Sequence, residues 1–306
     1  MKDSQQYYKE PGSFTNISSY NDVTVNITNN PEYICQIVQG LIVHGAWTKL
    51  YGFPSDSEKE SYPLYLSDLL TKILHYDARS ILIPRLPENR VIASCREFAT
   101  LACAILRVKG IPARCRCGFA AYLGYQGSLE DHWIVEYWNG IKWIANDPQI
   151  DPFQLSMLYK WGPNNVALKN EKIINNDFPN PHNLSFESDF IVAGKAWQLC
   201  RNGLFDPMKC GIEDLWGLWF VRGQLLRDFA ALNKVETTPH LCRRDLDWDT
   251  WRFLTANDFD LAESDFLLLD KIASLSLDVD NNLDTIIETY ELNPSLQVPN
   301  HILESR

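Results

Sequence analysis

The chain has 306 residues, 45% of them hydrophobic, and a formal net charge of −11. This length is enough for a sizeable core in one large domain or two ordinary ones. The ten Trp, thirteen Tyr and fourteen Phe argue against a disordered chain. The acidic charge argues against nucleic acid or an anionic membrane as the main partner. No stretch approaches about eighteen apolar residues, so we expect no membrane-spanning segment.

Eight cysteines lie mostly within apolar, periodic stretches. Such cysteines are typical of reduced thiols in a reducing compartment. The first fourteen residues contain no apolar core of signal-peptide length. We therefore expect a cytoplasmic protein, and the sequence indicates no cofactor.

The N-terminal half begins with a polar, Asn- and Ser-rich stretch over residues 1–30, which we predict to be a loosely ordered lead-in. Apolar residues at helical spacing then predict helices over about 31–51 and 65–75. After two prolines, a third helix is predicted from about Cys95 to Lys109, because apolar residues recur on one face and Gly110 suits the position after the last turn. The apolar residues of this helix are Phe98, Leu101, Ala102, Ile105 and Leu106.

Three strands are predicted next, over residues 113–122, 132–138 and 141–147. The last two are joined by Asn139-Gly140, a strong signal for a two-residue hairpin turn. In that register His132 lies directly across from Asp147 and shares a sheet face with it. The spacing thus predicts an imidazole beside a carboxylate.

The C-terminal part contains further helical patterns over about 189–201, 215–233 and 264–277, and we expect a weakly ordered tail beyond Asn293. The predicted fold class is α+β, with a helix packed on an antiparallel sheet and additional helices at both ends. We predict a catalytic core over residues 31–188 and a mainly helical region over 189–306 that packs on it.

Cys95 at the start of its helix is the candidate nucleophile. The thiolate is the reactive form of cysteine, and a helix N-terminus or a neighbouring imidazolium favours it. The backbone N–H groups there could also bind an oxyanion. If the helix tip meets the hairpin, Cys95, His132 and Asp147 form a triad with a nucleophile, a base and an orienting acid. Cys95 could instead be a small core residue, and Asp147 could cap the turn at Pro148.

Five segments resemble a bacterial transglutaminase-like family of about this length. They are NRVIASCREFATLACAILRVKGIPARCRCGFAAY, EDHWIVEYW, KWIANDPQID, FIVAGKAWQLCR and GLWFVRGQLLRDFAALNKVE. The resemblance runs from roughly residue 30 to 240. It implies a papain-like transglutaminase core with Cys95 as nucleophile, His132 as base and Asp147 as third member. Such proteins often have Asp-Ala-Gln where this chain has Asp147-Pro148-Gln149.

Three further residues are candidates for substrate binding: Trp133, Gln149 and Arg222. A core position is the alternative for Trp133, and a structural ion pair is the alternative for Arg222. Cys115 and Cys117 lack the spacing of a zinc site, so we predict no metal there and expect both thiols on one strand face.

Two classes of function remain open. The first is a cysteine enzyme that acts on a peptide, a protein or a small acyl or amide substrate through a thioester, with water or an amine as acceptor. The second is a non-catalytic module that binds a peptide or protein.

Overall fold

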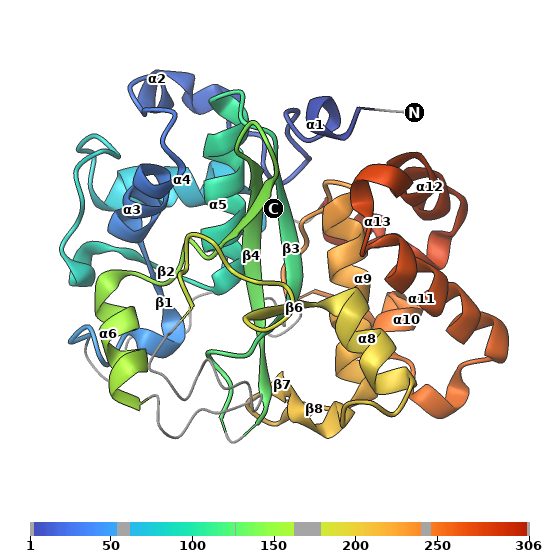
Figure 1. Cartoon of the computed structure of the whole chain (residues 1–306). Helices are drawn as coiled ribbons and strands as arrows, with labels where there is room; N and C mark the ends of the chain where they lie inside the picture. Colours follow the sequence, from blue (N-terminus) through green and yellow to red (C-terminus); the bar gives the residue numbers. More distant parts are fainter. Residues whose placement is uncertain (1–2, 54–61, 126, 162–178, 240–245, 305–306) are drawn as a thin grey trace.

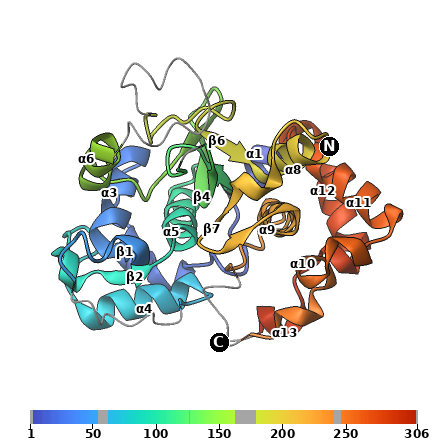
Figure 2. The same cartoon turned by 90° about the horizontal axis from the view of Figure 1, so that it is seen from below.

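The computed structural model describes residues 3–53, 62–125, 127–161, 179–239 and 246–304 (Figure 1). Within these residues a six-stranded, mainly antiparallel sheet has the order β6-β3-β4-β7-β8, with β5 also paired to β4. Its strands are β3 (Ala113–Ala120), β4 (Leu129–Trp138), β5 (Trp143–Asn146), β6 (Phe190–Val192), β7 (Cys210–Ile212) and β8 (Leu215–Trp216). Helices lie on either side of this sheet, which confirms the predicted α+β class (Figure 2).

One group of helices comes from the N-terminal half of the chain. It consists of α3 (Pro31–Leu41), α4 (Leu66–Tyr76), α5 (Cys95–Val108) and α6 (Pro152–Trp161), next to a parallel pair formed by β1 (Ile42–His44) and β2 (Val91–Ala93). Helix α5 packs on β4 and α3. Almost all of its residues are buried, because it is apolar on most of its surface. This helix therefore forms the centre of one core.

The second group comes from the C-terminal part. It consists of α8 (Ala193–Arg201), α9 (Leu218–Leu232), α10 (Arg252–Thr255), α11 (Glu263–Leu275), α12 (Val279–Leu292) and α13 (Asn300–Leu303). Helix α9 packs along β3, and Asp228 on α9 accepts hydrogen bonds from the Arg116 side chain and the Cys117 backbone N–H, each at 2.9 Å. Asp228 thus gives a hydrogen-bond acceptor to a backbone N–H at an otherwise unpaired edge of β3, and it joins the second helix group to the sheet.

Both ends of the chain are more ordered than the sequence suggested. Residues 3–30 contain α1 (Ser4–Tyr7) and α2 (Asn21–Thr24), and the buried Tyr8 donates a hydrogen bond to the Leu232 carbonyl at 2.8 Å. The expectation of a loose lead-in was therefore wrong. Ile302 in α13 is likewise buried. Single apolar side chains between polar residues anchor these ends, and such anchors give no periodic signal.

Two predicted boundaries also differ from the structure. The first predicted helix ends at Leu41, and the chain continues as β1. The region after residue 188 supplies β6 to the sheet, where it pairs with β3. The division into a core and a C-terminal region stays a prediction, but both parts share one sheet. Among the described residues, no helix combines the length and apolar character needed to cross a membrane.

Candidate active site

Cys95 is the first residue of α5, and only Ser94 separates it from the end of β2. Ser94 before it is extended, with φ −108° and ψ 173°. The Glu97 carboxylate turns back and accepts hydrogen bonds from the Ser94 backbone N–H at 2.8 Å and from its hydroxyl at 2.6 Å. This is half of a capping box, and it fixes the strand-to-helix corner that carries the thiol.

A buried arginine, Arg96, stabilises the first turn of α5. Arg96 pairs with Glu97 at 3.0 Å and donates to the backbone carbonyls of Glu236 and Leu64. Both charged side chains are fully buried. Because buried charges are stable only when they are paired, these contacts hold the first turn of α5 in one position.

His132 and Asp147 form the predicted pair, although the hairpin differs from the predicted one. The Nε2 atom of His132 lies 2.8 Å from Oδ2 of Asp147, and both side chains are buried. Trp138 pairs with Trp143 rather than with Ile141, so the turn contains four residues and the register is shifted by two. The predicted two-residue turn was wrong. A shift of two keeps every side chain on its predicted face, so the two residues still meet.

Asp147 is held from three directions. Its Oδ2 also accepts the Tyr122 hydroxyl at 2.6 Å, and its Oδ1 accepts the Gln149 backbone N–H at 2.9 Å. Burial opposes ionisation of Asp147, but the charge of His132 and these hydrogen bonds outweigh burial and lower its pKa. Asp147 is therefore an ionised acceptor that fixes the orientation of the His132 ring.

The same interaction with Asp147 shifts the pKa of His132 in the opposite direction. Burial alone would lower the pKa of His132, but the charge of Asp147 and the shared hydrogen bond outweigh it, so the pKa is raised. A raised pKa favours an imidazolium ion at neutral pH. Such a cation is the partner that stabilises a nearby thiolate.

Two observations relate α5 to the His132–Asp147 pair. Helix α5 packs on β4, which carries His132. The pKa of Tyr122 is raised mainly by burial, then by the charge of Asp147, and also by charge on Cys95. Tyr122 thus lies within electrostatic range of both the acid and the thiol. Cys95 is 7% exposed.

The three residues predicted to bind substrate are buried and make contacts within the protein. Trp133 is fully buried in the core next to α5. Gln149 is buried and donates its backbone N–H to Asp147. Arg222 is buried and donates to the Phe253 carbonyl at 2.6 Å and to the Asp258 carboxylate. The substrate-binding role of the three residues stays a prediction. In this structure Trp133 and Arg222 are buried with structural partners, and Gln149 supports the candidate acid.

Tyr122 was missed at the sequence level. It follows β3 at an even-numbered position, and Gly118 on that strand pairs with His132. Alternation along β3 therefore placed the Tyr122 side chain on the face of His132. A signal was present, but tyrosine is so common in strands that parity alone could not single it out.

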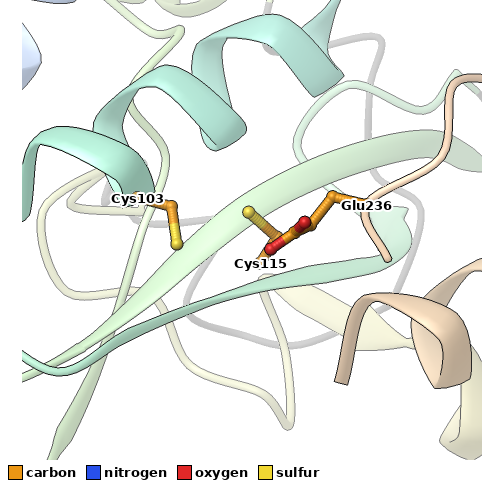
Figure 3. Close-up of side chains that lie close together, drawn as sticks. All are labelled: Cys103, Cys115 and Glu236. Atoms are coloured by element: carbon orange, nitrogen blue, oxygen red, sulfur yellow. The ribbon is translucent and has the colours of Figure 1, made fainter. Parts of the chain in front are cut away.

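Two further thiols and a carboxylate lie together in the core (Figure 3). The donor atoms of Cys103, Cys115 and Glu236 all lie within 4.8 Å of one another. Arg107 pairs with Glu236 at 3.0 Å and supplies the positive charge that a metal would otherwise provide. Burial and the thiol of Cys103 raise the pKa of Cys115, which keeps Cys115 protonated. We interpret this cluster as a buried ion pair beside two thiols, of which Cys115 is protonated.

Cys117 points into the same core cluster as Cys115, as the strand alternation predicted. Its thiol donates to the Gln224 side-chain carbonyl at 2.7 Å. Burial raises its pKa well above the usual range. Cys117 is therefore an inert core thiol.

Comparison with known proteins gives one match. Residues 75–148 match the family model described as the transglutaminase-like superfamily. This span contains Cys95, His132 and Asp147. No curated protein and no solved structure matches the chain. The mixed helix and sheet architecture fits the papain-like core that the sequence resemblance implied.

Proposed function

We propose that this chain is a cysteine enzyme that transfers acyl groups through a thioester at Cys95, and the match of residues 75–148 to the transglutaminase-like superfamily supports this proposal. The observation that carries the proposal is the buried hydrogen bond between His132 and Asp147, 2.8 Å long. Helix α5, which begins at Cys95, packs on β4, the strand that carries His132. A cysteine at a helix start, a base and an orienting acid are the components of a thiol-based triad.

The hydrogen-bond geometry suggests how the proton moves. Nε2 of His132 is engaged by Asp147, so Nδ1 is the ring nitrogen that takes the thiol proton. The thiolate then attacks the substrate carbonyl and forms a tetrahedral intermediate. When this intermediate collapses, the C–N bond breaks and His132 returns the proton to the departing amine. The thioester is released by water, which gives hydrolysis or deamidation, or by a second amine, which gives amide transfer.

The substrate is proposed only by class, as a peptide, a protein or a small acyl or amide compound. Neither nucleic acid nor a membrane surface is proposed as a partner, because the net charge is −11. A cytoplasmic location is supported by the free thiols of the seven cysteines among the described residues.

A binding module that reuses the fold is the second candidate. One observation favours it: Cys95 is only 7% exposed, and His132 only 1%. If these side chains never meet a substrate, their hydrogen bonds serve stability alone. The two candidates differ in whether Cys95 can be acylated.

An activated ester tests the proposal without knowledge of the natural substrate. Incubation with p-nitrophenyl acetate should acetylate Cys95 and release a burst of p-nitrophenolate that approaches one equivalent per chain. Peptide mass spectrometry should place the acetyl group on Cys95. The Cys95→Ala variant should show no burst, while Cys200→Ala, which removes a half-buried thiol in α8, should retain it. An equal burst from Cys95→Ala would refute the proposal.

A further inference from the structure

A second histidine, His44, lies next to the candidate active site. It is the last residue of β1, which runs parallel to β2. In this pair His44 is the partner of Ala93, which lies two residues before Cys95. The chain therefore brings His44 to the strand end from which the nucleophile emerges.

The direction of the His44 side chain follows from the same register. Paired residues of neighbouring strands point to the same face of the sheet, and successive residues alternate. Because Ser94 is extended, with φ −108° and ψ 173°, the alternation continues from Ala93 to Cys95. His44 and Cys95 thus leave the backbone on the same side.

One hydrogen bond fixes the tautomer of His44. The backbone N–H of Ala46 donates to Nδ1 of His44 at 3.2 Å. Because Nδ1 accepts, the proton of the neutral ring resides on Nε2. Within the part of the chain that the structure describes, this Nε2–H has no partner, and the side chain is only partly buried. His44 thus presents an available N–H donor.

The pKa of His44 is shifted in the opposite direction to the pKa of His132. Burial and, to a smaller extent, the charge of the nearby His132 lower the pKa of His44 to about 4, although the charge of Asp147 acts in the opposite direction. At neutral pH His44 is therefore a neutral donor and too weak a base to deprotonate a thiol. The raised pKa of His132 suits the base. Two neighbouring histidines whose pKa values are moved in opposite directions are suited to different roles.

We propose that Nε2–H of His44 donates a hydrogen bond to the oxyanion that forms when Cys95 attacks the substrate carbonyl, together with the backbone N–H of Cys95. This role rests on the proposed acyl transfer. A neutral N–H that is already oriented stabilises developing negative charge without transferring a proton. The proton transfers then belong to His132 alone.

Acetylation and alkylation of the Cys95 sulfur distinguish an oxyanion donor from a residue that only stabilises the thiolate. Acetylation by p-nitrophenyl acetate passes through an oxyanion. Alkylation by iodoacetamide displaces iodide and forms no oxyanion, so it requires only the thiolate. Loss of one oxyanion donor costs about 10²–10³-fold in rate. His44→Ala should therefore slow acetylation of Cys95 by about 10²–10³-fold and leave its alkylation rate unchanged.

A matched variant restores the donor. His44→Gln places a neutral amide N–H near the position of Nε2–H, and we expect it to acetylate Cys95 faster than His44→Ala. Unchanged alkylation in both variants also shows that the site is folded. Acetylation of His44→Ala at the wild-type rate would overturn the proposal. So would a parallel loss of alkylation, which would make His44 a support for the thiolate. If the wild-type protein is not acetylated at all, the proposed function itself fails, and the role of His44 with it.

Discussion

His132 and Asp147 are hydrogen-bonded at 2.8 Å, although the strand register that predicted their contact is shifted by two residues. Direct opposition is therefore not what brings them together. Both residues lie on one sheet face, and Asp147 continues past the end of β5 to reach the ring. The two side chains can meet because they lie on the same sheet face, and they need not be directly opposite each other. A register shift by an even number of residues keeps them on that face.

The first prediction concerns Asp147. Asp147→Asn should lower kcat by about 10²–10⁴-fold, because the ring loses its anionic acceptor. It should also move the alkaline limb of the pH–rate profile to lower pH, since the charge of Asp147 raises the pKa of His132. The pH dependence of p-nitrophenolate release measures both effects. Asp151→Asn is the control, because Asn can still accept from the Gln154 backbone N–H. An unaltered rate in Asp147→Asn would remove Asp147 from the mechanism.

The second prediction concerns Tyr122. Its hydroxyl donates to Asp147 at 2.6 Å, and Tyr122→Phe leaves that buried carboxylate with one partner fewer. We expect a loss of about 1–3 kcal/mol in the free energy of unfolding, measured in urea, together with a slower acetylation of Cys95.

Tyr51→Phe is the matched control for this variant. The Tyr51 hydroxyl donates to Asp151 at the same distance, 2.6 Å, and Asp151 is not part of the triad. Tyr51→Phe should affect stability without slowing acetylation. If both variants acetylate equally fast, Tyr122 does not position the acid.

The third prediction is a pH window for stability. The pKa of Asp147 is lowered from 3.8, so its contribution is present above that pH and is lost as the pH falls through the lowered pKa. The pKa of His132 is raised from 6.5, so its contribution is present below that pH and is lost as the pH rises through the raised pKa. The stability difference between wild type and Asp147→Asn should be largest between pH 3.8 and 6.5. Urea unfolding across this range measures it, and a flat difference would contradict the assigned shifts.

The fourth prediction tests the junction between the sheet and α9. Arg116 is buried and pairs with Glu136 at 3.1 Å and with Asp228 at 2.9 Å. Removal of one partner from a buried ion pair typically costs about 3–5 kcal/mol. Arg116→Ala should therefore destabilise the protein by about that amount, whereas Arg252→Ala, which breaks an exposed pair with Asp265, should cost about 0–1 kcal/mol. Comparable losses in urea unfolding would contradict this view of the junction.

The sequence predicted those features that follow from local periodicity and residue type. The helix that begins at Cys95, the strands around it and the His132–Asp147 pair follow from apolar spacing, a cap and strand alternation. The hydrogen bonds by which Arg96 holds the first turn of α5 were not predictable, because their carbonyl acceptors lie far away along the chain. His44 was missed for the same reason: its meeting with Ala93 depends on the pairing of two short strands about fifty residues apart.

The most direct test is the alkylation rate of each cysteine by iodoacetamide as a function of pH, measured by peptide mass spectrometry. Exposure alone predicts that half-buried Cys200 reacts before Cys95, which is 7% exposed. An activated thiolate predicts the reverse order well below pH 8.5, the usual range of a free thiol, and a loss of that preference in His132→Ala. If Cys95 reacts no faster than the other cysteines, or if His132→Ala leaves its rate unchanged, the account of a thiol–imidazole pair is wrong.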